Sequence, residues 1–410
     1  MAIRAHRANR GAAVVGGDGR RSPGLDLQPP LVTTGEPLSR RAEDLFREAF
    51  HADPTAVVSA PGRINIIGEH TDYNDGFVLP AAIDRYVTVA FRPRPRGPVE
   101  MVSDQSQARL QFDGLPPERQ GTWGDYVIGV ARALGDQGVS SFELAAATTI
   151  PVGAGLSSSA ALEVASALAM LHSKAAGMPL ADVARLCRGV ENDFIGARTG
   201  IMDPFISLAG RAGSALLLDC RSLQARVCPL PGDRWAWVLA DTRVKHQNAS
   251  SAYNERRAEC EAAAKEMGVP SLRDATEDDV NRLTDPVLRA RARHVVAENA
   301  RTRAAATVLE SGDPQTLGPL LFASHASLKN DFEVSCEELD ALVELAASAP
   351  GVIGARMMGG GFGGCVLILV AAEAVDPLQT RLGGAYAGRF GQPPTFYRVR
   401  AVDGAWAIDS

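Results

Sequence analysis

The pattern of hydrophobic and polar positions differs between the two halves of the chain. Short runs rich in β-branched and aromatic residues predict strands. They lie at Ala56–Ala60, Ile64–Ile67, Tyr86–Phe91, Val99–Val102, Leu110–Phe112, Phe142–Ile150, Ser214–Asp219, Trp235–Asp241 and Cys365–Val370. Apolar residues at helical spacing predict helices. They lie at Arg40–Phe50, Tyr126–Leu134, Ala160–Ala176, Asp182–Phe194, Tyr253–Met267, Asp285–Ser311 and Glu338–Ala346.

Strands dominate the first half of the chain, and helices dominate the second half before closing strands. This order favours an α+β fold with mixed β-sheets over alternating βαβ units. A chain of 410 residues, 46% hydrophobic and 22% charged, fits two medium domains. We expect a disordered Arg/Gly/Pro-rich arm over residues 1–36, an N-terminal domain over 37–210 and a C-terminal domain over 211–410.

Charge and cysteine content exclude several classes of protein. The net charge of −6 gives no electrostatic reason to expect nucleic acid or an anionic membrane as a partner. The six cysteines are scattered, without C-x-x-C or zinc spacing, so we expect reduced thiols. No run is long and apolar enough to cross a bilayer. We therefore expect a cytoplasmic monomer with small-molecule partners.

The segment Ala60–Pro80 carries the densest group of polar side chains. After the apolar run that ends at Ile67, the chain reads Gly-Glu-His-Thr-Asp-Tyr-Asn-Asp from Gly68 to Asp75. Carboxylates accept hydrogen bonds from hydroxyl groups, and the guanidinium of Arg63 can balance a developing negative charge. This inventory suits a polyhydroxylated ligand.

The segment Pro151–Glu163 is a second candidate, with small residues between a predicted strand and a predicted helix. Glycines let the backbone approach a ligand closely, and the free N–H groups of the helix start favour an anion such as phosphate. A Gly-Ser loop with an ordinary serine cap is the structural alternative. The segment is not a Walker loop, because no lysine follows, and Ser158 stands where a Rossmann fingerprint has its third glycine.

Three smaller features carry possible chemistry. Gly359, Gly361 and Gly364 form a G-x-G-x-x-G pattern, but a strand-like run follows it, which argues against dinucleotide binding. The aromatic pair Trp123 and Tyr126 suits either core packing or stacking on a base. Asp203 lies among apolar residues, and a buried carboxylate is rare unless it is paired or functional. Glu191 lies at the end of an Arg-rich helix, where it also suits a surface ion pair.

Taken together, these segments resemble the galactokinase family, sugar kinases of the GHMP small-molecule kinase superfamily. The residues from Gly62 to Tyr73 are similar to the family's own signature, Gly155–Ala160 to the superfamily phosphate loop, and Gly359–Gly364 to its third motif. The segment Ala252–Arg257 with Cys260 is similar to a further galactokinase segment.

The resemblance implies a two-domain GHMP kinase fold with the active site in the cleft between domains. It also implies ATP- and Mg²⁺-dependent phosphorylation of the anomeric hydroxyl of α-D-galactose. By position, Asp203 matches the catalytic aspartate and Arg63 its partner. Positions that match sugar contacts are Glu69, His70, Asp72, Gly200, Asp203 and Tyr253. Positions that match the nucleotide site are Trp123, Tyr126, Gly153, Ala154, Gly155, Leu156, Ser157, Ser158, Ser159, Gly360 and Gly361, and Ser159 and Glu191 match Mg²⁺ ligands.

The chain departs from the family pattern at three positions. Pro204 replaces the usual Gln after the catalytic Asp, and a proline pushes the preceding residue toward extended geometry. Ala252 replaces a frequent Glu, and Met358 replaces a common Thr, a change that we expect to affect loop packing. The alternatives are a kinase of the same fold acting on N-acetylgalactosamine or L-arabinose, a non-catalytic regulator that binds galactose and ATP, and a dinucleotide oxidoreductase. The intact serines of the phosphate loop argue against the regulator.

Overall fold

The structure is a computed structural model that describes residues 36–137, 139–174, 176–245 and 249–408. The expected N-terminal arm lies outside these residues except for Glu36. The strands are β1 (Ala56–Asn65), β2 (Phe77–Val78), β3 (Pro80–Pro93), β4 (Val99–Ser103), β5 (Ser106–Phe112), β6 (Phe142–Thr148), β7 (Ser214–Asp219), β8 (Ala225–Pro229), β9 (Trp235–Lys245), β10 (Val352–Met357), β11 (Gly363–Ala371), β12 (Thr395–Val399) and β13 (Trp406–Ile408).

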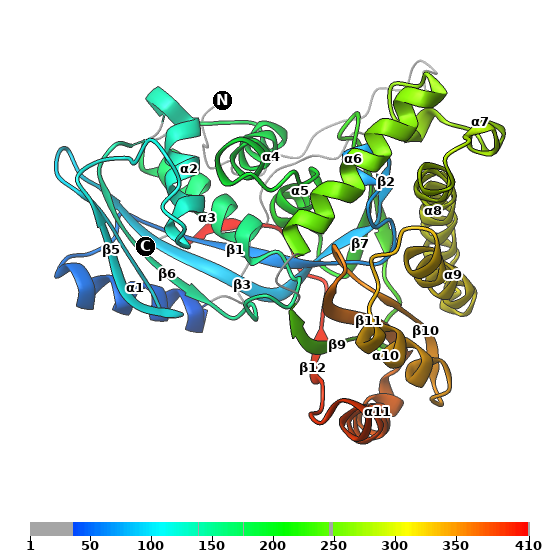
Figure 1. Cartoon of the computed structure of the whole chain (residues 1–410). Coiled ribbons are helices and arrows are strands. Elements are labelled where there is room, and N and C mark those ends of the chain that lie inside the picture. Colours follow the sequence, from blue (N-terminus) through cyan, green and yellow to red (C-terminus); the bar gives the residue numbers. More distant parts are fainter. Residues whose placement is uncertain (1–35, 138, 175, 246–248, 409–410) are drawn as a thin grey trace, which may run out of the picture.

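The helices lie on both sides of the sheets (Figure 1). They are α1 (Glu36–Phe50), α2 (Gly124–Leu134), α3 (Ser158–Ser173), α4 (Leu180–Gly189), α5 (Met202–Ala209), α6 (Ala249–Met267), α7 (Glu277–Arg282), α8 (Pro286–Ser311), α9 (Leu317–Asn330), α10 (Glu337–Ala347) and α11 (Val375–Phe390). In the described part of the chain, no helix is long and apolar enough to span a membrane.

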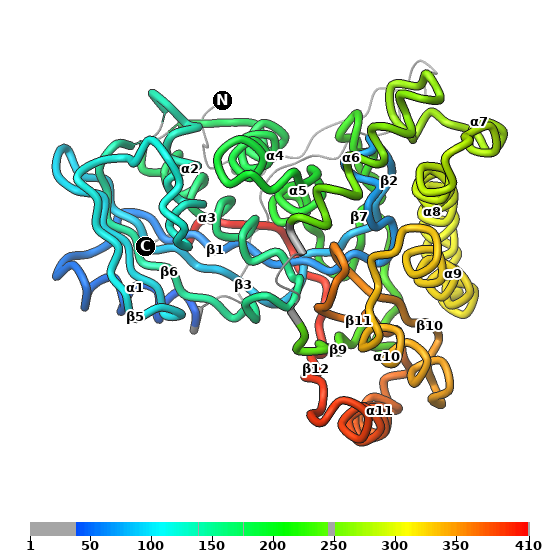
Figure 2. Tube along the Cα trace, in the orientation of Figure 1, coloured from blue at the N-terminus to red at the C-terminus, as the bar shows by residue number. Residues whose placement is uncertain are grey.

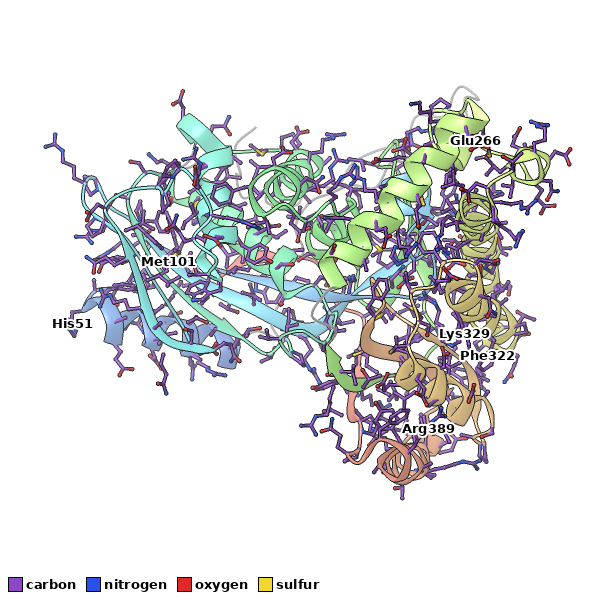
Figure 3. The ribbon with its side chains drawn as sticks, in the orientation of Figure 1. His51, Met101, Glu266, Phe322, Lys329 and Arg389 are labelled. Atoms are coloured by element: carbon purple, nitrogen blue, oxygen red, sulfur yellow. The ribbon has the colours of Figure 1, made fainter. Side chains whose placement is uncertain are left out.

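A six-stranded sheet, in the order β13-β1-β3-β6-β4-β5, supports the first half of the chain. Successive side chains of a strand point to opposite faces. On β1, Val57 therefore packs with Phe46 of α1, whereas Val58 packs into the main core. Figure 1 shows α1 on one face of this sheet and α2, α3 and α5 on the other. Figure 3 marks Met101, a fully buried residue of β4, within this half.

A four-stranded sheet, in the order β10-β11-β9-β12, supports the second half. Its central strands are buried on both faces, which explains the continuous apolar run of β11. Ile368 packs into the core beneath α10 and α11, while Leu367 and Leu369 pack into the main core shared with the first half. A three-stranded sheet, β2-β7-β8, completes the described architecture.

The end of the chain returns to the first sheet. In Figure 2 the red trace leaves α11, passes through β12 and runs back toward β1. β13 pairs with β1 through Ala407 opposite Val58. The domain division at residue 210 stays a prediction, and this pairing means that the last strand belongs to the sheet of the N-terminal half.

Most predicted elements are present, with differences at their ends. The two strands predicted at Ala56–Ala60 and Ile64–Ile67 are one strand, Ala56–Asn65, whose register shifts between Pro61 and Arg63. The helix predicted to Phe194 ends at Gly189 and continues as a short π-helix, Val190–Ile195. The sequence analysis missed α5, α7, α9 and α11 and the strands β2, β8, β10, β12 and β13. The six cysteines are free, as expected.

Candidate active site

Arg63 and Asp203 form a bidentate ion pair at the centre of the site. The β-bulge in β1 turns Arg63 inward, where its side chain is 7% exposed. Its Nε and Nη2 donate to Oδ1 and Oδ2 of Asp203 at 2.7 and 2.8 Å. Burial would lower the pKa of Arg63, but Asp203 reverses this effect, so the guanidinium stays charged. The pair predicted from the family resemblance is therefore formed.

The predicted phosphate loop lies against this pair. Nη1 of Arg63 donates to the carbonyl of Gly155, and the Arg63 backbone N–H donates to the carbonyl of Leu156 at 3.2 Å. Ser157 precedes the first residue of α3, and its Oγ donates to Oδ2 of Asp203. The N–H groups of the first turn of α3 have no acceptor within the helix. The loop residues Gly153–Ser159 thus bring a helix start to the Asp203 carboxylate.

Two further acidic side chains, Glu191 and Glu163, are buried near this helix start. Ser159 Oγ donates to Glu191 Oε1 at 3.1 Å, and Thr199 Oγ1 donates to Glu191 Oε2. Burial raises the pKa of Glu191 to about 7. Glu163, one turn after Ser159, is fully buried, and neither of its carboxyl oxygens has a hydrogen-bond partner among the described residues. Burial raises its pKa well above the ordinary range.

A pocket of about 240 Å³ opens beside the ion pair. Every position predicted to contact sugar lines it. Its lining residues are Arg63, Glu69, His70, Asp72, Thr199, Gly200, Met202, Asp203, Tyr253, Gly359 and Gly360. The lining is rich in acceptors, and Arg63 supplies its positive charge. Such a surface suits a neutral ligand with several hydroxyl groups.

Glu69 connects the sugar signature to the third glycine motif. It is 2% exposed, and its Oε2 lies 2.7 Å from Nη2 of the fully buried Arg356. Its Oε2 also accepts a hydrogen bond from Asn65, and its Oε1 accepts the backbone N–H of Gly359 at 2.9 Å. Glu69 therefore fixes two motifs to each other as well as lining the pocket, a role that its position in the signature did not indicate.

His70 and Asp72 present different chemistry to the pocket. Burial lowers the pKa of His70 to about 3, so its ring is neutral, and Nδ1 shares a hydrogen bond with the Tyr73 hydroxyl at 2.8 Å. Burial and the nearby Asp203 raise the pKa of Asp72 to about 6. Tyr253 packs against His70 with 5.3 Å between ring centroids, which closes one side of the pocket.

The remaining predicted nucleotide contacts lie outside the phosphate loop. Trp123 precedes the first residue of α2 and packs against the main core. Tyr126, on the first turn of α2, lies near enough to Glu191 and Glu163 for their charges to help burial raise its pKa to about 12. Gly360 lies in the sugar pocket and Gly361 packs against Val334. Base stacking by Trp123 and Tyr126, and nucleotide contacts by both glycines, stay predictions.

The structure tests the expectations for two positions that depart from the family pattern, Pro204 and Met358. The expectation that Pro204 pushes Asp203 toward extended geometry is wrong, because Asp203 and Pro204 lie in the first turn of α5. The first helical hydrogen bond joins Phe205 N–H to the Ile201 carbonyl, so the missing N–H of Pro204 breaks no bond. Met358 is 1% exposed, and its sulfur accepts the backbone N–H of Asn65 at 3.4 Å, so it does pack in the loop.

Sequence reasoning missed several residues of the site. Thr199 and Met202 line the pocket, and their only sequence signal was a place beside Gly200 and Asp203. Gly359 also lines the pocket, and the sequence analysis placed it in the third motif without assigning it a contact. Arg356 precedes the third motif, on β10, and the glycine pattern gave no sign that its side chain is fully buried.

Comparison with known proteins gives matches along most of the chain. Residues 44–93 match the galactokinase galactose-binding signature, residues 125–211 the GHMP kinases N terminal domain, and residues 305–387 the GHMP kinases C terminal family. The galactokinase of Roseiflexus sp. (strain RS-1) is 43% identical over 390 residues, which are 92% of this chain and 98% of the relative. The galactokinase of Homo sapiens is 42% identical over 391 residues, with the same coverage of 92% and 98%.

Solved structures agree with these sequence matches. Lactococcus lactis galactokinase complexed with galactose matches with a TM-score of 0.85 at 35% identity, covering 91% of this chain and 100% of that one. Methanococcus jannaschii mevalonate kinase, with a TM-score of 0.61 at 16% identity over 85% of this chain and 98% of that one, shares the fold alone. These matches confirm the resemblance and the predicted fold class. The chain belongs to the galactokinase family of the GHMP kinases, which are ATP-dependent phosphotransferases.

Proposed function

We propose that this protein transfers the γ-phosphoryl group of ATP to the anomeric hydroxyl of α-D-galactose and releases galactose 1-phosphate and ADP. The observation that carries the proposal is the position of the Arg63–Asp203 pair. It borders the pocket made by the galactose signature on one side. On the other side it contacts the phosphate loop through Gly155 and Ser157. Two substrates bound on these two sides would meet at Asp203.

The Asp203 carboxylate orients the sugar hydroxyl and accepts its proton as the oxygen attacks the γ-phosphorus. The bond between this phosphorus and the bridging oxygen of ADP breaks in the same transfer. Phosphoryl transfer depends mainly on alignment and on neutralising charge. Arg63 supports both, because it holds Asp203 by two hydrogen bonds and keeps a positive charge beside the moving phosphoryl group.

The start of α3 and a bound cation would share the charge of the phosphates. Ser159 and Glu191 offer the hard oxygen ligands that Mg²⁺ prefers, and Mg²⁺ takes only one or two carboxylates when phosphates supply the rest. In the described residues no group of three or more His, Cys, Asp or Glu side chains could hold a metal alone. The buried carboxyl of Glu163, which has no hydrogen-bond partner among the described residues, and the raised pKa of Glu191 fit a site that gains from a cation. When bound, Mg²⁺ neutralises phosphate charge.

The experiment is a sugar panel with ATP and Mg²⁺, with ADP release as the rate and ³¹P NMR to identify the product. We expect galactose to give the highest kcat/KM and a phosphate on the anomeric carbon. A higher value for N-acetylgalactosamine or L-arabinose would reject galactose as the substrate. Asp203→Asn, which keeps the shape of the side chain, serves as the inactive control; galactose binding by the wild type without turnover of any sugar would instead support a regulator.

A further inference from the structure

A stripe of buried polar residues on α8 faces the sugar signature. We define the α8 stripe as His294, Glu298 and Asn299, which are 0%, 0% and 7% exposed. His294 and Glu298 are four residues apart and therefore share a face of the helix. Charged and polar side chains are rarely buried without partners, so the partners of this stripe indicate what it does.

All three residues bond backbone groups of the segment Gly68–Phe77. The carboxylate of Glu298 accepts the N–H of Gly68 at 3.0 Å. Nε2 of His294 donates to the carbonyl of Glu69 at 3.1 Å, and Oδ1 of Asn299 accepts the N–H of Phe77 at 2.8 Å. These bonds hold both ends of the segment that carries three side chains of the pocket: Glu69, His70 and Asp72.

Both ends of the Glu298–Gly68 bond are fixed by their surroundings. The Glu298 carboxylate also accepts hydrogen bonds from Ser324 Oγ and Arg301 Nε, each at 2.6 Å. Gly68 has φ of +107°, and a Cβ there would lie 2.8 Å from the Phe77 carbonyl. Glycine is therefore required at this tight turn, and the Glu298 carboxylate holds its N–H.

We propose that Glu298 and His294 are positioning residues for the sugar site: they hold the Gly68–Glu69 backbone so that Glu69 and Asp72 meet the ligand. Neither residue lines the pocket, so both act through the backbone that they bind. This inference rests on the proposed function, because it assigns the pocket to galactose. It predicts that changes on α8 alter sugar binding and leave nucleotide binding nearly unchanged.

The test compares Glu298→Ala and Glu298→Gln with the wild type. Glutamine keeps an acceptor for the Gly68 N–H but loses the ion pair with Arg301. We expect Glu298→Ala to raise the galactose KM and Kd about tenfold, because small misplacements of binding groups are costly, and to change the ATP KM less than twofold. Glu298→Gln should restore most of the galactose affinity. Galactose affinity is measured by calorimetry without nucleotide, so it does not depend on turnover.

Val295→Ala is the matched control, because Val295 is a fully buried apolar residue of the same helix that packs in the core. It should lower the melting temperature and leave both KM values within twofold. The proposal is overturned if Glu298→Ala leaves the galactose Kd as in the wild type; where the alanine variant does not fold, it is overturned if His294→Leu leaves this Kd unchanged. An equal rise in galactose and ATP KM would also overturn it.

His294 gives a second, independent comparison. Burial lowers the pKa of His294 to about 4, so the neutral ring donates from Nε2 to the Glu69 carbonyl. His294→Gln keeps a donor near the Nε2 position, and His294→Leu removes it. We expect galactose affinity to fall in the order wild type, Gln, Leu; equal affinities for the two variants would contradict the role. A wild type that binds no galactose would reject the proposed function itself, before any α8 variant is compared.

Discussion

Arg63 and Asp203 meet through two parallel hydrogen bonds across 140 residues of sequence. Their side chains are 7% and 27% exposed, so both line the pocket and the carboxylate is the more exposed of the two. A third bond from Arg63 reaches the Gly155 carbonyl of the phosphate loop. One guanidinium thus sets the position of the carboxylate relative to both the pocket and the phosphate loop.

Arg63→Lys should lower kcat about 100-fold while the galactose KM changes little. A lysine keeps the charge but is a point donor that cannot reproduce the planar fork, and proton transfer by a positioned side chain contributes about 10²–10⁴-fold. Steady-state kinetics measure both parameters. Arg221→Lys, which alters an exposed pair with Asp274, is the control and should be neutral. A kcat within threefold of the wild type for Arg63→Lys would show that charge alone suffices.

Pro204→Gln should preserve galactose turnover within about threefold. Pro204 lies in the first turn of α5, where its missing N–H breaks no helical bond and Asp203 keeps helical geometry. Replacing the rigid proline gives the unfolded chain more conformational freedom, so the free energy of unfolding should fall by about 0.4–1 kcal/mol. Tm should then fall by roughly 1–3 °C. Kinetics and thermal unfolding measure the two effects. Pro204→Ala separates the loss of the ring from the added amide, and a fall in turnover beyond tenfold in both variants would mean that the site depends on proline.

The sequence was a good guide where the signal is local. The run after Ile67, the small residues before α3 and the aspartate among apolar residues all stood out. The run and the aspartate line one pocket, and the small residues contact the Arg63–Asp203 pair beside it. The pairing of Arg63 with Asp203 came from the family resemblance, since no local pattern links residues so far apart. The α8 stripe could not be predicted, because Glu298 and His294 bond backbone groups 230 and 225 residues away. The helical state of Asp203 was predicted wrongly because a rule about proline was applied without knowing the start of α5.

Gly200→Ala should weaken galactose binding strongly. A Cβ at Gly200 would lie 1.8 Å from Oδ2 of Asp72, so the carboxylate must move away. Misplacement of a positioned group can lower enzyme activity about 100-fold. We therefore expect at least a tenfold rise in the galactose Kd, measured by calorimetry. Gly384→Ala is the matched control: it lies in α11 with open space around it and should be neutral or slightly stabilising. An unchanged Kd in Gly200→Ala would mean that Asp72 does not contact the sugar.

Galactose binding should weaken as the pH falls below about 6. Burial raises the pKa of Asp72 to about 6, so the group is a carboxylate above this pH and a neutral acid below it. A carboxylate accepts hydrogen bonds from sugar hydroxyls at both oxygens, and protonation removes part of this capacity. Binding to the ionised form alone gives about a tenfold rise in Kd per pH unit below the pKa. His70, with a pKa of about 3, stays neutral through this range and adds no step of its own.

Calorimetry without nucleotide or Mg²⁺ isolates the sugar site from Glu191, and Asp72→Asn should bind galactose more weakly, with a Kd that does not change between pH 5 and 7. If galactose binding by Asp72→Asn still weakens below about pH 6, another group of the pocket causes the pH dependence.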